Sequence, residues 1–222
     1  MNRILILITL ILIHCNSILA QEAKDYETDF YRTRMTYFTE NPLKANQVVF
    51  LGNSLTQGGK WEQYFPAQDI ANRGIIGDNT HGMLARLEEI LLAKPTKLFI
   101  LTGVNDISQD YKTKHIRNNI KTIIREFKEK SPETTIYLQS LLPINNDFNR
   151  YKKLIGKEKQ ILCLNKQLKR LSKTQKVQFI NLYPLFLDKN GKLNESYTSD
   201  GLHLKEAAYD IWVQAIATYV EN

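Results

Sequence analysis

Two segments far apart in the chain carry the residues of a nucleophile and of a proton relay. Ser54 lies in a glycine-rich segment, residues 52–59, and Asp200 and His203 lie close to the carboxyl terminus. A serine hydroxyl is a poor nucleophile until an imidazole takes its proton, and the imidazole needs a carboxylate to hold its tautomer and stabilise its charged form. Asp200 and His203 are three residues apart at the predicted opening of a helix, which places both side chains on one side of a turn. The three residues are therefore candidates for a triad in acyl transfer.

Each of these residues also has an ordinary structural explanation. A serine at the start of a helix satisfies a free backbone N–H, so Ser54 is also a candidate helix cap. The glycine-rich turn around it also suits a phosphate, although the segment lacks the Lys-Ser/Thr pair of a P-loop. Asp200 is likewise a candidate cap for the last helix, with His203 as an exposed residue of its first turn.

Ester hydrolysis also requires hydrogen-bond donors for the oxyanion of the tetrahedral intermediate. Gly74 follows a short predicted strand, and we expect its backbone N–H to be unshielded by a side chain. Asn105 lies just beyond the apolar run 97–101, so we expect its amide at the same edge of the sheet. With the backbone N–H of Ser54, these residues make three candidate donors. The alternative is that Gly74 is a turn glycine and Asn105 a turn or cap residue.

The elements that must position these residues alternate between strands and helices. Apolar, β-branched runs predict buried strands, and apolar residues at helical spacing predict helices between them. This alternation is typical of βαβ units and of a parallel sheet that is covered on both faces, with the carboxyl ends of its strands at one edge. The predicted strands are residues 47–51, 69–73, 97–102, 135–141 and 177–182, and the predicted helices cover 26–40, 83–91, 116–127, 157–173 and 203–219.

The joint pattern resembles the SGNH hydrolases, the Gly-Asp-Ser-Leu esterase family. It combines the glycine-flanked Ser54, Gly74, the Gly-x-Asn-Asp segment at Asn105 and an Asp-x-x-His segment, all at ends of predicted strands. The resemblance covers the chain from Val48 to the final helix. The resemblance implies that Ser54 is the nucleophile, that His203 is the general base and acid, and that Asp200 orients it. It implies Ser54, Gly74 and Asn105 as oxyanion donors. It also implies a three-layer α/β/α, flavodoxin-like fold with a mostly parallel five-stranded sheet, and no metal or organic cofactor.

Some positions limit or extend this interpretation. Asn53 stands where the family usually has aspartate, which puts the geometry of the local turn in question but leaves the triad complete. The α/β-hydrolase alternative fits less well, because Thr56 interrupts the Gly-x-Ser-x-Gly elbow. After residue 20, the histidines are widely separated, and none has a second His or Cys at the spacing of metal ligands. No metal site is therefore predicted. His81, near the predicted oxyanion loop, is a candidate for lining the substrate site.

The first twenty residues have the pattern of a cleaved signal peptide. Arg3 precedes an apolar run of about ten residues, too short for a membrane span that needs roughly twenty helical residues. We expect residues 1–20 to be removed before Gln21, and residues 21–222 to form one secreted or periplasmic domain without a stable membrane span. Lipid attachment at Cys15 is not expected, because the preceding residue is not small.

Without the leader, the chain carries 29 basic and 23 acidic side chains, a net charge of +6. Its lysines mostly lie on predicted helices whose other face is apolar, which favours a solvated surface over a nucleic-acid or polyanion surface. We therefore expect no nucleic-acid partner. The one remaining thiol, Cys163, forms no internal disulfide and is interpreted as a packing residue.

Within the family, the chain is most similar to the acetylhydrolases related to platelet-activating factor acetylhydrolase and to bacterial carbohydrate acetylesterases. This resemblance implies O-acetyl groups on sialic acid or other glycans as substrates. A lysophospholipase or thioesterase is the first alternative, and the loop of residues 142–155 would then form an acyl channel with Ile144, Phe148 and Tyr151. A noncatalytic glycan-binding module is the second, although no triad residue is missing. The oligomeric state does not follow from the sequence.

Overall fold

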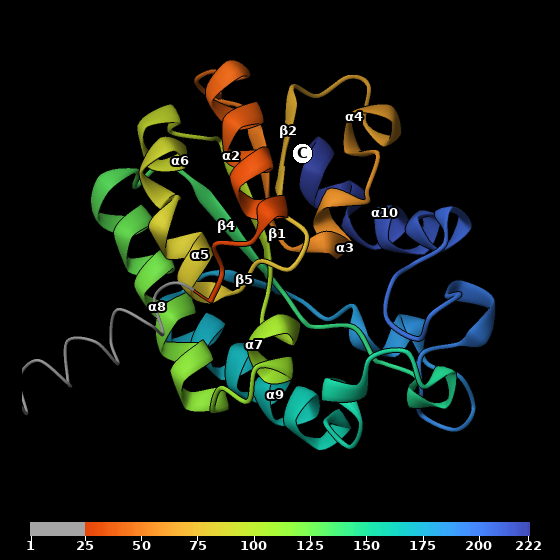
Figure 1. The fold of residues 1–222 in the computed structure, drawn as a ribbon. Helices are drawn as coiled ribbons and strands as arrows, with labels where there is room; N and C mark the ends of the chain where they lie inside the picture. The colour runs from red at the N-terminus through yellow and green to blue at the C-terminus, as the bar shows by residue number, and fades with distance from the viewer. Residues whose placement is uncertain (1–24) are drawn as a thin grey trace, which may run out of the picture.

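The computed structural model describes residues 25–222, and its centre is a sheet of five parallel strands. The strand order is β2-β1-β3-β4-β5. Figure 1 shows the strands at the centre of the molecule with helices around them. The predicted leader, with its cleavage before Gln21, lies outside the described residues. The strands are β1 (Val48–Gly52), β2 (Ile70–Gly74), β3 (Lys97–Leu101), β4 (Thr135–Gln139) and β5 (Gln178–Ile180).

The number of strands and their parallel direction agree with the sequence-based prediction, whereas some strand ends differ. β4 ends at Gln139, two residues before the predicted end at 141, because the N–H of Leu141 bonds to the side chain of Asn165 (2.8 Å) and not to a neighbouring strand. β5 is shorter than the predicted 177–182 and pairs only with β4. Both chain segments thus leave the sheet early to build loops at its carboxyl edge.

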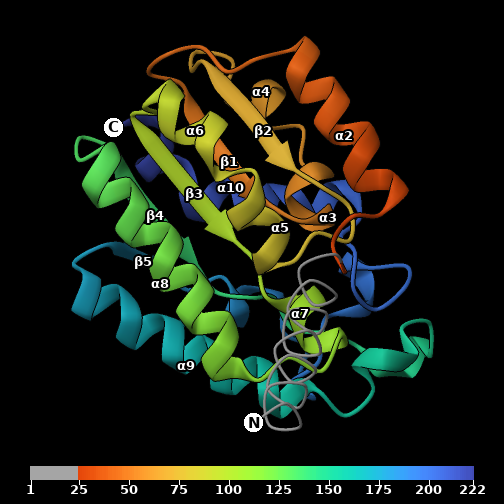
Figure 2. The ribbon, with the colours of Figure 1, turned by 60° about the vertical axis from the view of Figure 1, so that its left-hand side comes forward.

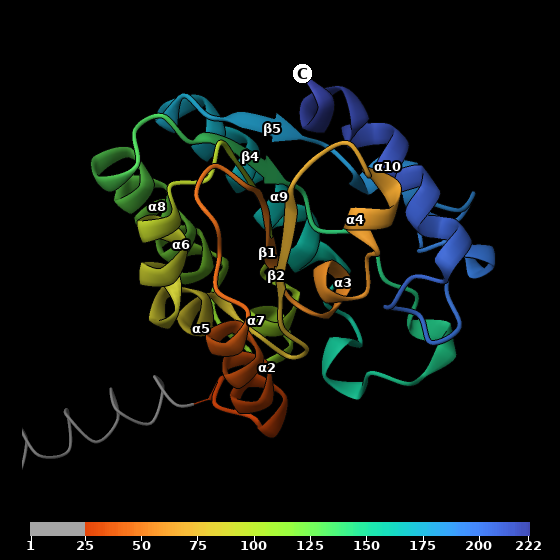
Figure 3. The ribbon, with the colours of Figure 1, turned by 90° about the horizontal axis from the view of Figure 1, so that it is seen from above.

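Alternate side chains of the strands face opposite sides of the sheet and define two apolar cores. In β1, Val49 and Leu51 contribute to one core, and Val48 and Phe50 contribute to the other. The first core is covered by α5 (Thr80–Ala85), α6 (Leu87–Ala93), α7 (Val104–Ser108), α8 (Thr113–Lys130) and α9 (Glu158–Gln175). The second is covered by α3 (Ser54–Gln57), α4 (Trp61–Tyr64) and α10 (Glu206–Glu221). Figure 3 shows α6 and α8 on one side of the sheet and α4 and α10 on the other, so the predicted three-layer α/β/α fold is confirmed.

A row of stacked aromatic rings joins three central strands on the α10 side. The ring of Phe50 lies between Trp61 (4.3 Å between centroids) and Phe99 (4.8 Å), and Phe99 stacks on Tyr137 (4.5 Å). Offset stacking of this kind adds about 0.5–1.5 kcal/mol per pair to the burial of the rings. The row fixes β1, the strand that precedes Ser54, against its neighbours.

Helix α2 (Asp29–Glu40) covers the open edge of β2 (Figure 2). It begins later than the predicted residue 26, because the hydroxyl of Thr28 accepts the N–H of Tyr31 (3.1 Å) and caps the helix. Arg34 donates to the carbonyls of Gly74 (3.2 Å) and Asn72 (3.3 Å), which lie at the strand edge. The helix therefore satisfies edge groups that would otherwise be available to pair with another strand.

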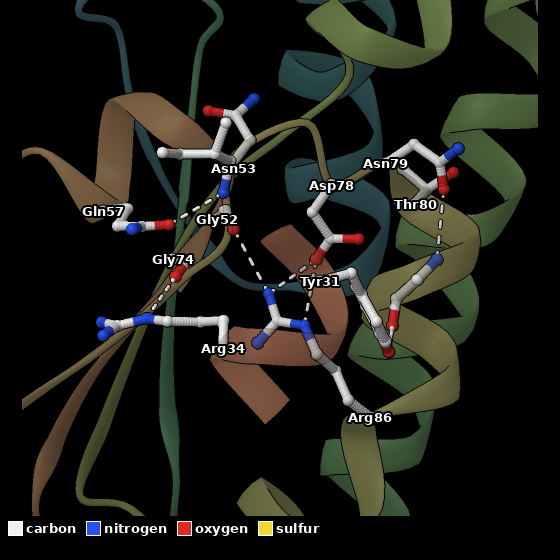
Figure 4. Close-up of polar contacts among 12 residues, drawn as sticks. Tyr31, Arg34, Gly52, Asn53, Gln57, Gly74, Asp78, Asn79, Thr80 and Arg86 are labelled. Atoms are coloured by element: carbon white, nitrogen blue, oxygen red, sulfur yellow. Dashed lines mark hydrogen bonds and ion pairs between the residues drawn. The ribbon is translucent and has the colours of Figure 1, made fainter. Parts of the chain in front are cut away.

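The apolar stripe predicted as one helix over residues 83–91 is divided into α5 and α6. The break is at Arg86, whose backbone angles (φ −110°, ψ 15°) are not helical. Its guanidinium turns into the protein and donates twice to Asp78 Oδ2, at 3.0 Å from Nε and 2.7 Å from Nη2 (Figure 4). Nη2 also donates to the carbonyl of Gly52 at 3.2 Å. The arginine that interrupts the predicted apolar stripe is therefore one member of a buried ion pair.

The Arg86–Asp78 pair is withdrawn from water, with side-chain exposures of 1% and 0%. Burial raises the pKa of Asp78 to about 6, although the charge and hydrogen bonds of Arg86 act in the opposite direction. The pair joins the end of β1, two residues before Ser54, to the loop that follows β2. It therefore holds two segments of the predicted site in a fixed relation.

Three further features differ from or add to the sequence-based expectations. The last helix begins at Glu206 and not near His203, so Asp200 and His203 lie in an irregular turn before it. Cys163 is exposed, so its interpretation as a packing residue is wrong. Short 3₁₀ helices occur at Asn146–Phe148, Lys152–Leu154, Tyr183–Phe186 and Glu195–Tyr197. Across residues 25–222, no helix is both long enough and apolar enough to cross a membrane.

The buried pair predicts an unequal response to loss of two arginines. Arg86→Met leaves Asp78 buried without its counter-charge, and we expect the free energy of unfolding to fall by about 3–5 kcal/mol. The matched control is Arg125→Met on α8, whose side chain is 58% exposed and makes only solvent-facing ion pairs; there we expect a change of about 0.5 kcal/mol or less. Urea denaturation at pH 7 measures both, and equal losses in the two variants would contradict the role given to Arg86.

Candidate functional site

The structure brings Ser54, His203 and Asp200 together at the carboxyl edge of the sheet. Ser54 Oγ lies 2.9 Å from His203 Nε2, and His203 Nδ1 lies 2.8 Å from Asp200 Oδ2. Ser54 is the first residue of α3 and follows β1, whereas the other two residues come from the turn before α10. The contact predicted between the two distant segments is therefore present, and it has the geometry of a nucleophile, a base and an orienting carboxylate.

The position of Ser54 is set by its neighbour. Asn53 caps α3, since its Oδ1 accepts the N–H of Leu55 at 3.1 Å. The residue that differs from the family's aspartate thus supplies the side-chain oxygen that the turn needs. Because Asn53 fulfils the capping role, the hydroxyl of Ser54 is left to contact His203.

Asp200 holds the turn that contains His203. Its Oδ1 accepts the N–H groups of Leu202 (2.9 Å) and His203 (2.8 Å), so it closes a local turn and does not cap a helix. Burial acts to raise the pKa of Asp200, but hydrogen bonds from the imidazole, these N–H groups and the hydroxyl of Tyr151 outweigh it and lower the pKa to about 2. An ionised Asp200 requires a proton on Nδ1 of His203, which leaves the lone pair of Nε2 for the hydroxyl of Ser54.

Gly74 does not present the free donor that the sequence suggested. Its N–H donates to Asn72 Oδ1 at 2.9 Å. A Cβ atom at this position would lie 2.2 Å from the backbone nitrogen of Gln57. Glycine is therefore needed here for close packing of β2 against α3, and the prediction that Gly74 donates to an oxyanion is not supported by this geometry.

Gly77, three residues later, meets the requirement that Gly74 fails. It has φ +78° in a turn closed by a bond from the N–H of Asp78 to the carbonyl of Ile75 (3.1 Å). Within residues 25–222 its N–H makes no hydrogen bond, and no atom lies within 4 Å of the place a Cβ would take. The sequence signal that could have identified it is the second glycine of the segment, directly before Asp78.

Asn105 lies beside this turn, on α7 after β3. Its Nδ2 donates to the carbonyl of Asp78 at 2.8 Å, which fixes the amide and leaves its second N–H for another acceptor. The backbone N–H of Ser54, at the first position of α3, has no partner within the helix. Three donors, from the ends of β1, β2 and β3, are thus available at one edge of the sheet.

The other residues singled out in the sequence lie at the margin of the site or outside it. Ile144 is buried in the first core, and the hydroxyl of Tyr151 contacts Asp200. His81 Nε2 lies 2.8 Å from His115 Nε2 on α8. In the described part of the chain, no three His, Cys, Asp or Glu side chains are grouped so that they could hold a metal ion.

Comparisons with known proteins identify the family of the chain. Residues 50–211 match the GDSL-like lipase/acylhydrolase family. The chain is 27% identical to the human platelet-activating factor acetylhydrolase IB subunit alpha1 over 179 residues, 78% of this chain and 74% of that protein. It is 28% identical to an N-acylneuraminate cytidylyltransferase of Escherichia coli over 156 residues, 69% of this chain but 35% of that protein. The solved structure of a GDSL-like lipase from Bacteroides thetaiotaomicron superposes with a TM-score of 0.74 at 27% identity, covering 86% of this chain and 97% of the other. The chain therefore belongs to the GDSL-like lipase/acylhydrolase family and is an esterase by class.

Proposed function

We propose that the chain is a serine-dependent carboxylic ester hydrolase that removes O-acetyl groups from carbohydrates through an acyl-enzyme on Ser54. The observation that carries the proposal is the continuous line of contacts from Ser54 Oγ through His203 to Asp200, with distances of 2.9 Å and 2.8 Å. The contacts join side chains 149 and 3 residues apart in the sequence. The leader pattern supports secretion or a periplasmic location as part of the same proposal.

In the proposed reaction, Ser54 Oγ attacks the ester carbonyl while Nε2 of His203 takes its proton. The negative charge that develops on the carbonyl oxygen is met by the N–H groups of Ser54 and Gly77 and by the amide of Asn105. His203 then gives the proton to the leaving alcohol, and an acyl group remains on Ser54. Water then attacks the acyl carbonyl and loses a proton to His203, which passes it to Ser54 Oγ as the bond between Oγ and the acyl group breaks and the acid leaves. Asp200 stabilises the imidazolium in both halves.

Two observations support a short acyl group. Of the three side chains proposed for the wall of a long acyl channel, Ile144 is buried in the core and Tyr151 is bonded to Asp200, so only Phe148 is free to fill that role. The human relative is named an acetylhydrolase, and the bacterial relative is named for an N-acylneuraminate, a sugar acid. Acetyl esters of sugars, sialic acid included, combine these two indications.

The serine mechanism predicts a large and specific loss of rate. Ser54→Ala removes the nucleophile, and we expect kcat/KM on 4-nitrophenyl acetate to fall on the order of 10⁴-fold or more. Thr39→Ala, which removes an exposed hydroxyl on α2, is the matched control and should leave the rate unchanged. Comparable rates for Ser54→Ala and the wild type would exclude the acyl-enzyme on Ser54.

The oxyanion assignment predicts an effect on kcat. Asn105→Ala removes one of the three donors, and we expect kcat to fall about 100-fold or more, with a small change in KM, because the contact strengthens in the transition state. Asn118→Ala, an exposed asparagine on α8, is the control of the same chemical change. A rise in KM alone would place Asn105 in ground-state binding.

Substrate class is tested by released acid. We expect acetyl esters to be hydrolysed faster than octanoyl esters, and acetate to be released from at least one member of a panel of O-acetylated sialic acids and acetylated xylo-oligosaccharides. Octanoyl preference would favour a lysophospholipase or thioesterase. Binding of glycans without release of acetate, together with no activity on aryl esters, would favour a noncatalytic glycan-binding module.

A further inference from the structure

The loop after β4 is fastened to the turn that carries Asp200 and His203. The N–H of Asn145 donates to the carbonyl of Gly201 at 2.8 Å, and its Nδ2 donates to the carbonyl of Leu193 at 3.0 Å. Gly201 has φ +84°, and a Cβ at this position would lie 2.1 Å from the carbonyl oxygen of Asn145. Such a close approach of two backbones requires glycine at the middle of the turn. The loop and the turn therefore form one packed unit.

Tyr151, in the same loop, reaches the hydrogen bond between the carboxylate and the imidazole. Its Oη lies 2.9 Å from Asp200 Oδ2 and 2.9 Å from His203 Nδ1. Its ring meets the imidazole edge to face, with centroids 5.6 Å apart and planes at 69°. One hydroxyl thus contacts both members of a pair whose own separation is 2.8 Å.

The positions of the protons in this group of three follow from the charges. Asp200 is ionised, so Nδ1 of His203 carries a proton and donates it to Oδ2. A protonated Nδ1 has no lone pair that could accept a hydrogen bond, so the hydroxyl of Tyr151 can donate only to Asp200. Burial raises the pKa of Tyr151 to about 12, and its hydrogen bond to Asp200 acts in the same direction, so the hydroxyl keeps its proton at neutral pH.

We propose that Tyr151 is a positioning residue, which orients Asp200 and withdraws part of its negative charge from His203. The role rests on the proposed function, since Tyr151 acts only through the pair that activates Ser54. The carboxylate is otherwise accessible, with 24% of the Asp200 side chain and 38% of the His203 side chain exposed. A fixed hydroxyl therefore takes the place of water molecules that would reorient as the imidazole gains and loses its proton.

Removal of the hydroxyl has a consequence that loss of packing alone would not produce. Without the second donor, the whole charge of Oδ2 acts on His203, and the imidazolium is stabilised relative to the neutral ring. The imidazole then holds its second proton to a higher pH, so the neutral base is available only above that pH. The acid limb of the kcat/KM profile should move upward, while the aromatic ring of a phenylalanine would keep the edge contact with His203.

The test compares Tyr151→Phe with Tyr37→Phe, a control at an exposed tyrosine of α2 (45% exposed). For Tyr151→Phe we expect kcat on 4-nitrophenyl acetate at the plateau to be about 3- to 10-fold lower, with KM within about twofold of the wild type. The acid limb of kcat/KM should shift upward by about 0.5–1 pH unit. Tyr37→Phe should reproduce the wild type in all three quantities. Equal urea midpoints for the two variants would show that the fold is intact.

A second measurement separates this inference from the proposed function. The pH titration of the His203 ring protons, followed by NMR in the Ser54→Ala background, reports the contact without any turnover. An upward shift of this titration on Tyr151→Phe supports the role of Tyr151 even if Ser54→Ala proves as active as the wild type, a result that would reject only the serine mechanism. An unchanged NMR titration together with an unchanged acid limb would overturn the inference.

Discussion

The site depends on the buried ion pair between Arg86 and Asp78. Arg86 bonds at once to Asp78 and to the carbonyl of Gly52, so one guanidinium connects the nucleophile turn with the loop that carries Gly77 (Figure 4). Two charges without water are costly unless their geometry is fixed. The surrounding chain supplies that geometry: the helical stripe breaks at Arg86, and Gly82 leaves the space for Asp78, since a Cβ there would lie 2.0 Å from Oδ1.

The parallel sheet explains why so few residues suffice for the site. Strand order reverses between β1 and β3, which makes this the switch point of the sheet, where ligands of such folds usually bind. Ser54 follows β1 and Asn105 follows β3, so both lie beside the switch point on rigid elements. Asp200 and His203 lie on the longer connection between β5 and α10. Hydrogen bonds from Asn145 and Tyr151 hold this connection in place.

The sheet and its flanking helices could be predicted from the sequence, because apolar periodicity depends only on neighbouring residues. The contact between Ser54, His203 and Asp200 could be predicted because several motifs occur together in the chain. The sequence did not identify Gly77, because the freedom of a backbone N–H depends on what its neighbours bond, and the side chain of Asn72 occupies the N–H of Gly74. It also did not reveal the contact of Tyr151 with Asp200, because the two residues lie 49 positions apart and Tyr151 is in a loop without periodicity. The prediction that the last helix begins at His203 was wrong, because the side chain of Asp200 accepts the N–H groups of Leu202 and His203 and forms a turn there.

Two carboxylates near the site illustrate how environment divides their roles. Asp78 is fully buried and its pKa is raised to about 6, so it binds a proton more tightly in the folded than in the unfolded chain, and its contribution to the free energy of unfolding falls as the pH rises from about 4 to about 6. Asp200 is partly exposed and accepts hydrogen bonds from three side chains and two backbone groups, and its pKa falls to about 2. The contribution of Asp200 to the free energy of unfolding is complete above about pH 4 and is lost as the pH falls towards 2. As the pH falls from about 6 to about 4, Asp78 therefore takes up a proton, whereas Asp200 stays ionised. The number of hydrogen-bond donors, and not burial alone, decides the charge of each carboxylate.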